Sequence, residues 1–331
     1  MMNGTARMDG ESIEERIKAE LTARAGGLGL DANALEIRYV LNWGGFVNRS
    51  YHVTDGTRRL HLKLAGEPEY VDGLRRWRRV AGLLAARYHA PRMLAWLHVI
   101  GTPLEGPVFE HIDGTTAQAR TPALLRATAP LLSQLHGDAE LAAHLAAESP
   151  PPRCRDTFTD TFIRRFREDL EHVRKHPIPF VPAATVDWIE HEADTLEREA
   201  ETRPEFVEPA DAPIHADLWL GNLLEGTHGR VWVLDWDDLT LGDPALDWAA
   251  LLGPTRGDVS LSGHATLPAE AREPGLAERL PLYARATLLD WILDPLADWI
   301  EADVSPGHAA KVRAEKERIH RAALACYRAT Y

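Results

Sequence analysis

The sequence predicts an α+β protein of two lobes, a small lobe rich in antiparallel strands (1–110) and a larger, mostly helical lobe (111–331). Its length of 331 residues suits two lobes, at about 150 residues per domain. Apolar and polar residues alternate between 36 and 65, which is the pattern of strands, whereas from about residue 121 the apolar spacing is mostly helical.

The small lobe should begin with a helix and continue as an antiparallel meander. Apolar residues recur every four positions over 11–25, and Gly26–Gly27 should end that helix. Asp55–Gly56 is a strong hairpin turn signal. The strand patterns that follow the helix are 36–43, 44–53 and 58–65.

The third strand of this meander places a lysine opposite its apolar face. The leucines at positions 60, 62 and 64 alternate with other residues, so Lys63 lies on the other face, beside His61. A helix over 70–88 should end before Pro91, and a short strand over 106–112 should end at Asp113–Gly114.

The larger lobe is expected to be helical with one β interruption. A hairpin is predicted within 212–236, where NLLEG and RVWVLDW flank a Thr-His-Gly turn. The predicted helices are 121–147, 156–175, 183–203, 280–302 and 305–329. A cleft between two such lobes is a preferred place for a small-molecule site.

Composition excludes several classes of protein. Apolar residues make up 45% and charged residues 26% of the chain, which is typical of a globular protein. No apolar run approaches the roughly 20 residues that span a bilayer. The N-terminus turns acidic where a signal peptide would be apolar, so we expect a cytoplasmic protein. Cys154 and Cys326 are then most simply two reduced thiols.

Charge is distributed unevenly along the chain. Residues 1–106 carry 15 Lys and Arg against 12 Asp and Glu, whereas residues 107–331 carry 22 against 38. This distribution argues against nucleic acid and anionic membranes as partners. It suits an anionic ligand at one end and a cationic one at the other, although acidic helix faces that only keep the protein in solution would give the same balance.

One segment combines the residue types that phosphoryl transfer needs. Residues 214–238 hold His215, Asp217 and Asn222 in the spacing H-x-D-x-x-x-x-N, and Asp235 follows at the end of a strand. Each of these alone could cap a turn or end a strand, but together they favour a functional site.

The chemistry of phosphoryl transfer gives each of these residues a task. Transfer from ATP needs an acceptor hydroxyl, a carboxylate that takes its proton, and a metal ion on the phosphates. Asp217 can be that carboxylate. Asn222 and Asp235 can converge on Mg²⁺, which prefers oxygen ligands and keeps several waters.

Three segments resemble the aminoglycoside phosphotransferase and choline kinase-like family, which is related to the protein kinases. HADLWLGNLL (215–224) resembles its catalytic loop. Residues 231–249 resemble its metal loop and the GDP-x-x-D segment after it, and WGGFVNRSYHV (43–53) resembles its nucleotide loop. The resemblance implies a protein-kinase-like bilobal fold and an ATP- and Mg²⁺-dependent O-kinase.

The resemblance also implies roles for individual residues. Asp217 would be the catalytic aspartate, Asn222 and Asp235 the metal ligands, and His215 a brace for the loop. Lys63 would contact the α- and β-phosphates. The other implied positions are Gly44, Gly45 and Asn48 over the nucleotide, backbone groups of Glu110 to Ile112 at the adenine edge, Asp243 and Asp247 as fasteners of the loops, and Asp237 at a usual acidic position.

The chain departs from the family pattern in two places. The family usually has a glutamate in the helix after the lysine strand, but GLRRWRRVAGLL (73–84) contains no acid. The candidate replacements are Glu67, Glu69 and Asp72. Ala216 stands where the family usually has glycine. A non-catalytic nucleotide-binding protein of the same fold is therefore an alternative to an enzyme.

The acidic balance of the larger lobe favours a small, cationic, hydroxylated acceptor such as an aminoglycoside or an amino sugar. Asp290 and Asp294 share a helix face in LLDWILDPLADWIEADV (288–304), near two tryptophans, and are candidate substrate residues; the alternative is a solvated helix face. Choline, ethanolamine, homoserine and ketosamines remain alternative acceptors, and the sequence leaves monomer and dimer both open.

Overall fold

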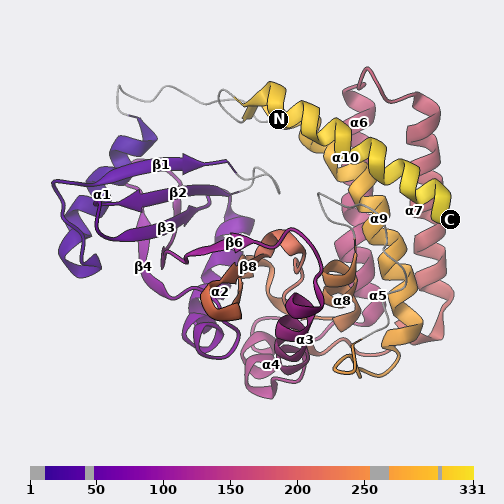
Figure 1. Ribbon diagram of the computed structural model, residues 1–331. Helices are drawn as coiled ribbons and strands as arrows, with labels where there is room; N and C mark the ends of the chain where they lie inside the picture. The colour runs from indigo at the N-terminus through magenta and orange to yellow at the C-terminus, as the bar shows by residue number, and fades with distance from the viewer. Residues whose placement is uncertain (1–11, 42–47, 254–267, 305–307) are drawn as a thin grey trace. The chain divides into compact units, whose positions relative to one another are not determined.

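The computed structural model describes residues 12–41, 48–253, 268–304 and 308–331, and the chain forms two compact units. The first unit comprises the chain up to Ala86 together with Pro91–Ile112. The second comprises Arg87–Ala90 and Asp113–Tyr331. Figure 1 shows strands gathered in the first unit and helices in the second.

The first unit is built on a five-stranded antiparallel sheet with the strand order β1-β2-β3-β5-β4. The strands are β1 (Glu36–Val40), β2 (Arg49–Thr54), β3 (Arg59–Leu64), β4 (Met93–His98) and β5 (Glu105–Glu110). The predicted meander of the first three strands and the short fourth strand, seen here as β5, are confirmed. Strand β4 was not predicted, because its sequence MLAWLH lacks the alternation that distinguishes a half-buried strand.

Helix α1 (Ile13–Leu28) is longer than its sequence suggests. A capping box starts it: Glu15 N donates to Ser12 Oγ at 3.2 Å, and Ser12 N donates to Glu15 Oε2 at 2.6 Å. The prediction that Gly26–Gly27 would end the helix is wrong, since it ends at Gly29 with φ 67°. Leu28 is buried, and its packing offsets the low helix propensity of the two glycines.

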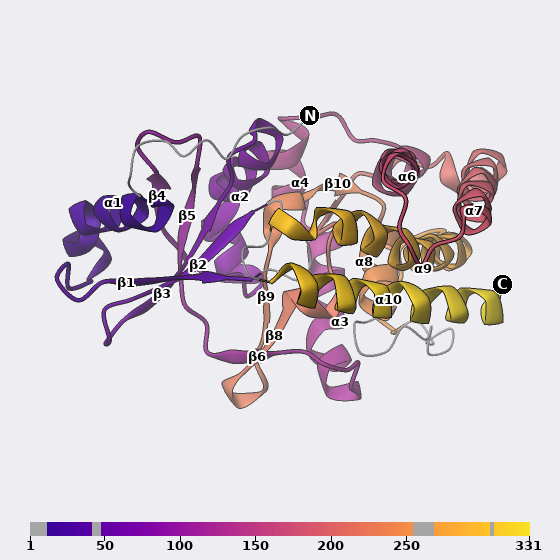
Figure 2. The same cartoon turned by 90° about the horizontal axis from the view of Figure 1, so that it is seen from above.

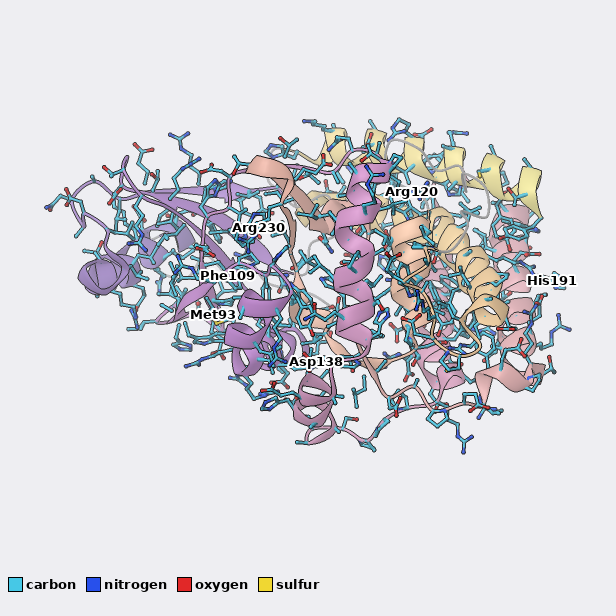
Figure 3. All side chains as sticks on the ribbon, turned by 60° about the horizontal axis from the view of Figure 1, so that its bottom comes forward. Met93, Phe109, Arg120, Asp138, His191 and Arg230 are labelled. Atoms are coloured by element: carbon cyan, nitrogen blue, oxygen red, sulfur yellow. The ribbon has the colours of Figure 1, made fainter. Side chains whose placement is uncertain are left out.

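The two faces of this sheet meet different helices. Leu60, Leu62 and Leu64 of β3 share a buried core with Ile17 and Leu21 of α1. On the opposite face, α2 (Pro68–Arg87) places an indole on the sheet. The rings of Trp77 and Phe109 lie 4.4 Å apart, centroid to centroid, and Figure 3 shows Phe109 beside Met93, its partner on β4.

The second unit is mostly helical. Its longer helices are α3 (Pro122–His136), α4 (Ala139–Ala146), α6 (Arg164–Lys175), α7 (Ala183–Thr202), α8 (Pro244–Leu252), α9 (Leu276–Glu301) and α10 (Ala309–Thr330). Helices α9 and α10 run side by side, and α6 and α7 pack against α9 (Figures 1 and 2). None of the described helices is both long and apolar enough to cross a membrane.

Two of the predicted helices are subdivided. The single helix predicted over 121–147 is wrong, because Gly137 ends α3 and Asp138 caps α4. The Asp138 carboxylate accepts hydrogen bonds from Glu140 N and Leu141 N, both at 3.0 Å, and Figure 3 labels this residue. The helix predicted over 156–175 is α5 (Cys154–Phe158) and α6, joined by a π-helical turn.

Short strands interrupt the helices of this unit. Strands β8 (Leu223–Gly226) and β9 (Val231–Val233) form the predicted hairpin, and β7 (Ala212–Ile214) pairs with β10 (Thr240–Gly242). Strand β6 (Gly114–Thr116) also pairs with β8. Strand β5 ends before Asp113–Gly114, as predicted, but a second strand, which was not predicted, begins at Gly114 in another sheet.

Glycine makes the pairing of β6 with β8 possible. A Cβ on Gly114 would lie 2.8 Å from the carbonyl oxygen of Glu225 and 2.3 Å from Leu224 Cδ2. Only a residue without a side chain allows this close approach of the two backbones.

Candidate functional site

The loop between β7 and β8 is fastened to α8 by a buried carboxylate. His215 N donates to Asp247 Oδ2 and Ala216 N donates to Asp247 Oδ1, each at 2.9 Å. Asp247 is fully buried, so these hydrogen bonds are shielded from water. The backbone immediately before Asp217 is thereby held in one place.

His215 links this loop to the end of β9. Its Nε2 donates to the carbonyl of Leu234 at 2.8 Å, and its Nδ1 accepts from Asp217 N at 3.3 Å. The ring also packs on Trp236, with centroids 4.7 Å apart. His215 therefore braces the loop against the strand end that carries Asp235.

Asn222 holds the carboxylate of Asp217. Its Nδ2 donates both to the backbone carbonyl and to Oδ2 of Asp217, each at 2.8 Å. Leu234 N donates to the Asn222 carbonyl at 2.8 Å, which ties this residue to the start of the next loop. With its amide nitrogen engaged, Asn222 keeps its side-chain oxygen Oδ1 as the atom that could bind a cation.

Negative charge is concentrated around Asp217. Burial raises the pKa of Asp217 well above its usual value, and the neighbouring carboxylates of Asp238, Asp235 and Asp237 raise it further, while the hydrogen bond from Asn222 opposes the shift. Asp235 itself has φ 66°, in the left-handed region. Such crowding of carboxylates costs free energy unless a proton or a cation lies among them.

The donor set fits a magnesium ion that is shared with phosphates. In the described part of the chain, no three His, Cys, Asp or Glu side chains are grouped so as to hold a metal by themselves. Asn222 Oδ1 and the Asp235 carboxylate are hard oxygen donors, and Mg²⁺ is often bound by one or two protein ligands together with substrate phosphates and waters. These two residues could therefore hold Mg²⁺ together with a nucleotide.

Comparisons with known proteins identify the family of the chain. Residues 39–289 match the model of the phosphotransferase enzyme family, APH. The chain belongs to that family. No curated protein sequence matches the chain.

Solved structures show the same fold at low sequence identity. A putative aminoglycoside phosphotransferase from Ralstonia eutropha has a TM-score of 0.60 and 17% identity, over 95% of this chain and 97% of the other. A choline kinase from Cryptosporidium parvum has 0.57 and 15%, over 95% of both chains. A spectinomycin phosphotransferase, solved with ADP and spectinomycin, has 0.53 and 13%, over 90% and 94%. The predicted family, kinase-like fold and class of small-molecule phosphotransferase are thus confirmed.

In this phosphotransferase, Ala216 adopts a conformation that favours glycine, with φ 69°. We expect Ala216→Gly to relieve about 1–2 kcal/mol of left-handed strain and to lose about 0.4–1 kcal/mol through a more flexible unfolded chain. The expected net change in the free energy of unfolding, measured in urea, is a stabilisation of up to about 1.5 kcal/mol. A clear destabilisation would show that the alanine methyl group stabilises the loop by packing.

The residues proposed to bind the nucleotide lie mainly in the first unit. Lys63 and Asn48 are both buried, and Lys63 lies on the face of β3 opposite the leucines, as its register predicts. Gly44 and Gly45 lie outside the described residues. Glu110 N donates to the carbonyl of Arg92 at 3.0 Å, so this amide is already engaged within the sheet.

Of the three candidate replacements for the missing acid of α2, one is paired and two have exposed side chains. Asp72 forms an ion pair with Arg75, at 3.2 Å, and the side chains of Glu67 and Glu69 are exposed. In the middle of α2, where the family usually has a glutamate, Trp77 faces the sheet. The helix is thus packed on the sheet by an aromatic contact.

The acidic face of α9 is turned inward and already has basic partners. Asp290 pairs with Arg165 of α6, and Asp298 pairs with Lys316 of α10. Asp294 lies 4.0 Å from the same lysine and is 40% exposed. The alternative of a fully solvated face therefore does not apply.

The pKa values of this cluster reflect its burial. The cluster consists of Asp169 on α6 and the carboxylates of α9. Burial raises the pKa values of Asp169, Asp290 and Asp298 to about 7, 6 and 7, respectively, although the nearby Arg165 and Lys316 lower them. Repulsion from Asp294 adds to the shift in all three. The cluster thus holds more negative than positive charge when its carboxylates are ionised.

Three residues of the second unit escaped the sequence analysis. Arg279 of α9 forms a buried bidentate ion pair with Asp243, at 2.7 and 2.9 Å. Glu273 lies 2.7 Å from His136. The ring of Trp219, two residues after Asp217, meets Trp291 of α9 at 6.0 Å. Long-range contacts reveal all three roles. No local motif marks Glu273 and Arg279, which follow residue 255, whereas Trp219 lies inside the segment that resembles the catalytic loop.

Proposed function

We propose that the chain is an ATP- and Mg²⁺-dependent O-kinase that phosphorylates a hydroxyl of a small cationic molecule, such as an aminoglycoside or an amino sugar. The proposal depends on the Asp217 carboxylate. Asn222 orients it, and it lies among other carboxylates in the loop that Asp247 holds in place. A base needs this kind of fixed position within reach of the hydroxyl that it deprotonates.

The proposed reaction uses Asp217 as the proton acceptor. The acceptor hydroxyl gives its proton to the Asp217 carboxylate while its oxygen forms a bond to the γ-phosphorus. The bond between that phosphorus and the oxygen bridging to the β-phosphate breaks, and ADP leaves. Bound Mg²⁺ would neutralise developing charge on the phosphates, and Asn222 and Asp235 would hold it.

The family and its relatives support ATP as the donor of the phosphoryl group. The spectinomycin phosphotransferase of the same fold was solved with ADP, which supports an adenine nucleotide here. We propose that Lys63 contacts the α- and β-phosphates, that Gly44, Gly45 and Asn48 cover the nucleotide, and that the backbone from Glu110 to Ile112 meets the base.

The acceptor is proposed to lie against Trp219 and Trp291. Trp219 follows Asp217 by two residues, and its indole leaves no room for a side chain at Gly221, where a Cβ would lie 2.2 Å from the ring. Trp291 meets it edge to face, with an angle of 73° between the rings, and neighbours Asp290. Indole faces beside a surplus of carboxylates attract an ammonium group. Asp290 and Asp294 would act by charge rather than by direct contact.

Trp291→Ala is expected to raise the KM for the acceptor about threefold to thirtyfold, which corresponds to the loss of one cation–π contact. The KM for ATP should change by less than about twofold, because the first unit is untouched. Trp299→Ala is the matched control on the same helix, since that indole meets Phe180 edge to face and lies under the guanidinium of Arg313 instead. Equal effects of the two substitutions on the acceptor KM would contradict the assignment.

A coupled assay of nucleoside diphosphate release tests the proposal directly. The acceptors are aminoglycosides, amino sugars, choline, ethanolamine and homoserine, each with Mg–ATP and Mg–GTP. A cationic acceptor that is phosphorylated supports the proposal. The lack of an acid in 73–84, where the family usually has a glutamate, motivates one alternative, a nucleotide-binding protein without catalysis. Nucleotide binding by calorimetry with no turnover on any acceptor would favour that alternative.

A further inference from the structure

A chain of buried contacts leads from the catalytic loop to the start of α9. Asp247 accepts from the backbone amides of His215 and Ala216, and its Oδ2 lies 3.0 Å from His136 Nε2. On the other side of the ring, His136 Nδ1 lies 2.7 Å from Glu273 Oε1. The last residue of α3 thus joins a carboxylate of α8 to one that precedes α9.

We propose that Glu273 is a positioning residue for the catalytic loop: through His136 and Asp247 it holds the amides of His215 and Ala216, and with them Asp217, in place. This inference rests on the proposed function for its catalytic meaning. The contacts themselves need no substrate, so the two can be tested separately.

The geometry requires a charged imidazole. Both ring nitrogens of His136 face carboxylate oxygens, and each nitrogen must carry a proton to donate to them. The side chain of His136 is 2% exposed and that of Asp247 is 0% exposed, so neither charge is balanced by water. The carboxylates on the two sides of the ring therefore stabilise the imidazolium, which in turn compensates the buried Asp247.

The pKa of His136 agrees with this arrangement. Burial lowers it, but the hydrogen bonds and the charges of Asp247 and Glu273 outweigh burial, so that the pKa stands above its usual value. Burial raises the pKa of Glu273, and His136 together with the hydrogen bond from Trp248 brings it below its usual value. The charged groups that act most strongly on the ring are Asp247 from α8 and Glu273 from the segment before α9.

The direction of the pH dependence follows from these shifts. A histidine with a raised pKa contributes its stabilisation fully at low pH and loses it as the pH rises through the folded-state pKa. A glutamate with a lowered pKa contributes above its usual pKa and loses its effect as the solution becomes acidic. The loop is therefore held best between the usual pKa of the glutamate and the raised pKa of His136, and it loosens as the pH rises through that raised pKa.

Glu273→Gln separates charge from shape. The glutamine keeps an oxygen that can accept from His136 Nδ1 but removes the negative charge, so the pKa of His136 should fall. We expect the amides of His215 and Ala216 to exchange with deuterium about tenfold faster at pH 8, measured by mass spectrometry on peptides covering 213–219. The alkaline rise in exchange should start at a lower pH than in the wild type. Glu278→Gln, on an exposed side chain in the first turn of α9, is the matched control.

Activity gives a second readout once an acceptor is known. We expect Glu273→Gln to lower kcat about tenfold while the KM values for ATP and acceptor change less than twofold, with the alkaline limb of the kcat profile moved to lower pH. Glu273→Asp, which restores the charge with a shorter reach, should recover part of the loss.

The outcomes distinguish the two proposals. Exchange at 213–219 that is equal in Glu273→Gln and the wild type across the pH range would overturn the positioning role. The nitrogen resonances of His136 in the wild type add a test without any variant, because a neutral ring at pH 7 would also overturn it. Altered exchange in a protein that phosphorylates no acceptor would leave the positioning role intact and reject the proposed function.

Discussion

Asp217→Asn should lower kcat by about 10²- to 10⁴-fold, because an amide cannot accept the proton of the acceptor hydroxyl. The substitution keeps the size of the side chain and an oxygen that can accept the hydrogen bond from Asn222 Nδ2, at 2.8 Å. The KM for the nucleotide should change little. Steady-state kinetics with the acceptor found by the screen would measure this loss.

A matched control and a stability measurement complete this experiment. Asp211→Asn removes a carboxylate that is exposed before β7, and we expect kcat to stay within about twofold. Removing the negative charge of Asp217 also relieves repulsion from Asp235 and Asp238, so the variant should be at least as stable as the wild type. A kcat unchanged by Asp217→Asn would rule out Asp217 as the base.

Arg279→Ala should destabilise the second unit by about 3–5 kcal/mol, since it leaves the buried carboxylate of Asp243 without its charged partner. Arg279 donates to both oxygens of Asp243, and the two residues are 3% and 0% exposed. Asp243 also accepts from Ala245 N at 3.0 Å and so caps α8, the helix that carries Asp247. Loss of Arg279 should therefore loosen the catalytic loop as well as the fold.

Chemical denaturation, followed by tryptophan fluorescence, would measure this effect. Arg174→Ala is the matched control, because Arg174 also pairs with both oxygens of a glutamate, Glu190, but on the surface. We expect that control to cost less than about 1 kcal/mol. The double variant Arg279→Ala, Asp243→Ala should be less destabilised than the sum of its parts, because it leaves no unpaired buried charge. Strict additivity would show that the ion pair contributes little.

Local patterns were sufficient where a residue's role depends on its neighbours in the chain. The alternation of Leu60, Leu62 and Leu64 placed Lys63 on the other face of β3, and the structure agrees. The hairpin of β8 and β9 followed from a turn signal between two apolar runs. By contrast, β4 and β6 escaped prediction, because their strand character depends on pairing with β5 and β8.

The candidate site also has one part that the sequence predicted and one part that it did not. The spacing of His215, Asp217 and Asn222 marked the loop that we propose to be catalytic, and its hydrogen bonds join residues close in sequence. The acidic face of α9 was recognised as a cluster but not as one that basic residues of α6 and α10 already neutralise in part. A helical repeat shows which residues share a face, but not what that face meets.

The sequence by itself determined the two-part α+β architecture, the family and the order of the reactive residues, because short-range periodicity and a fixed motif encode them. Only the tertiary structure decided what holds Asp217 in place, through Asp247, His136 and Glu273, and which charges are buried and paired. The physical reason is that burial and pairing set the free energy of a charge, and both depend on residues more than a hundred positions apart.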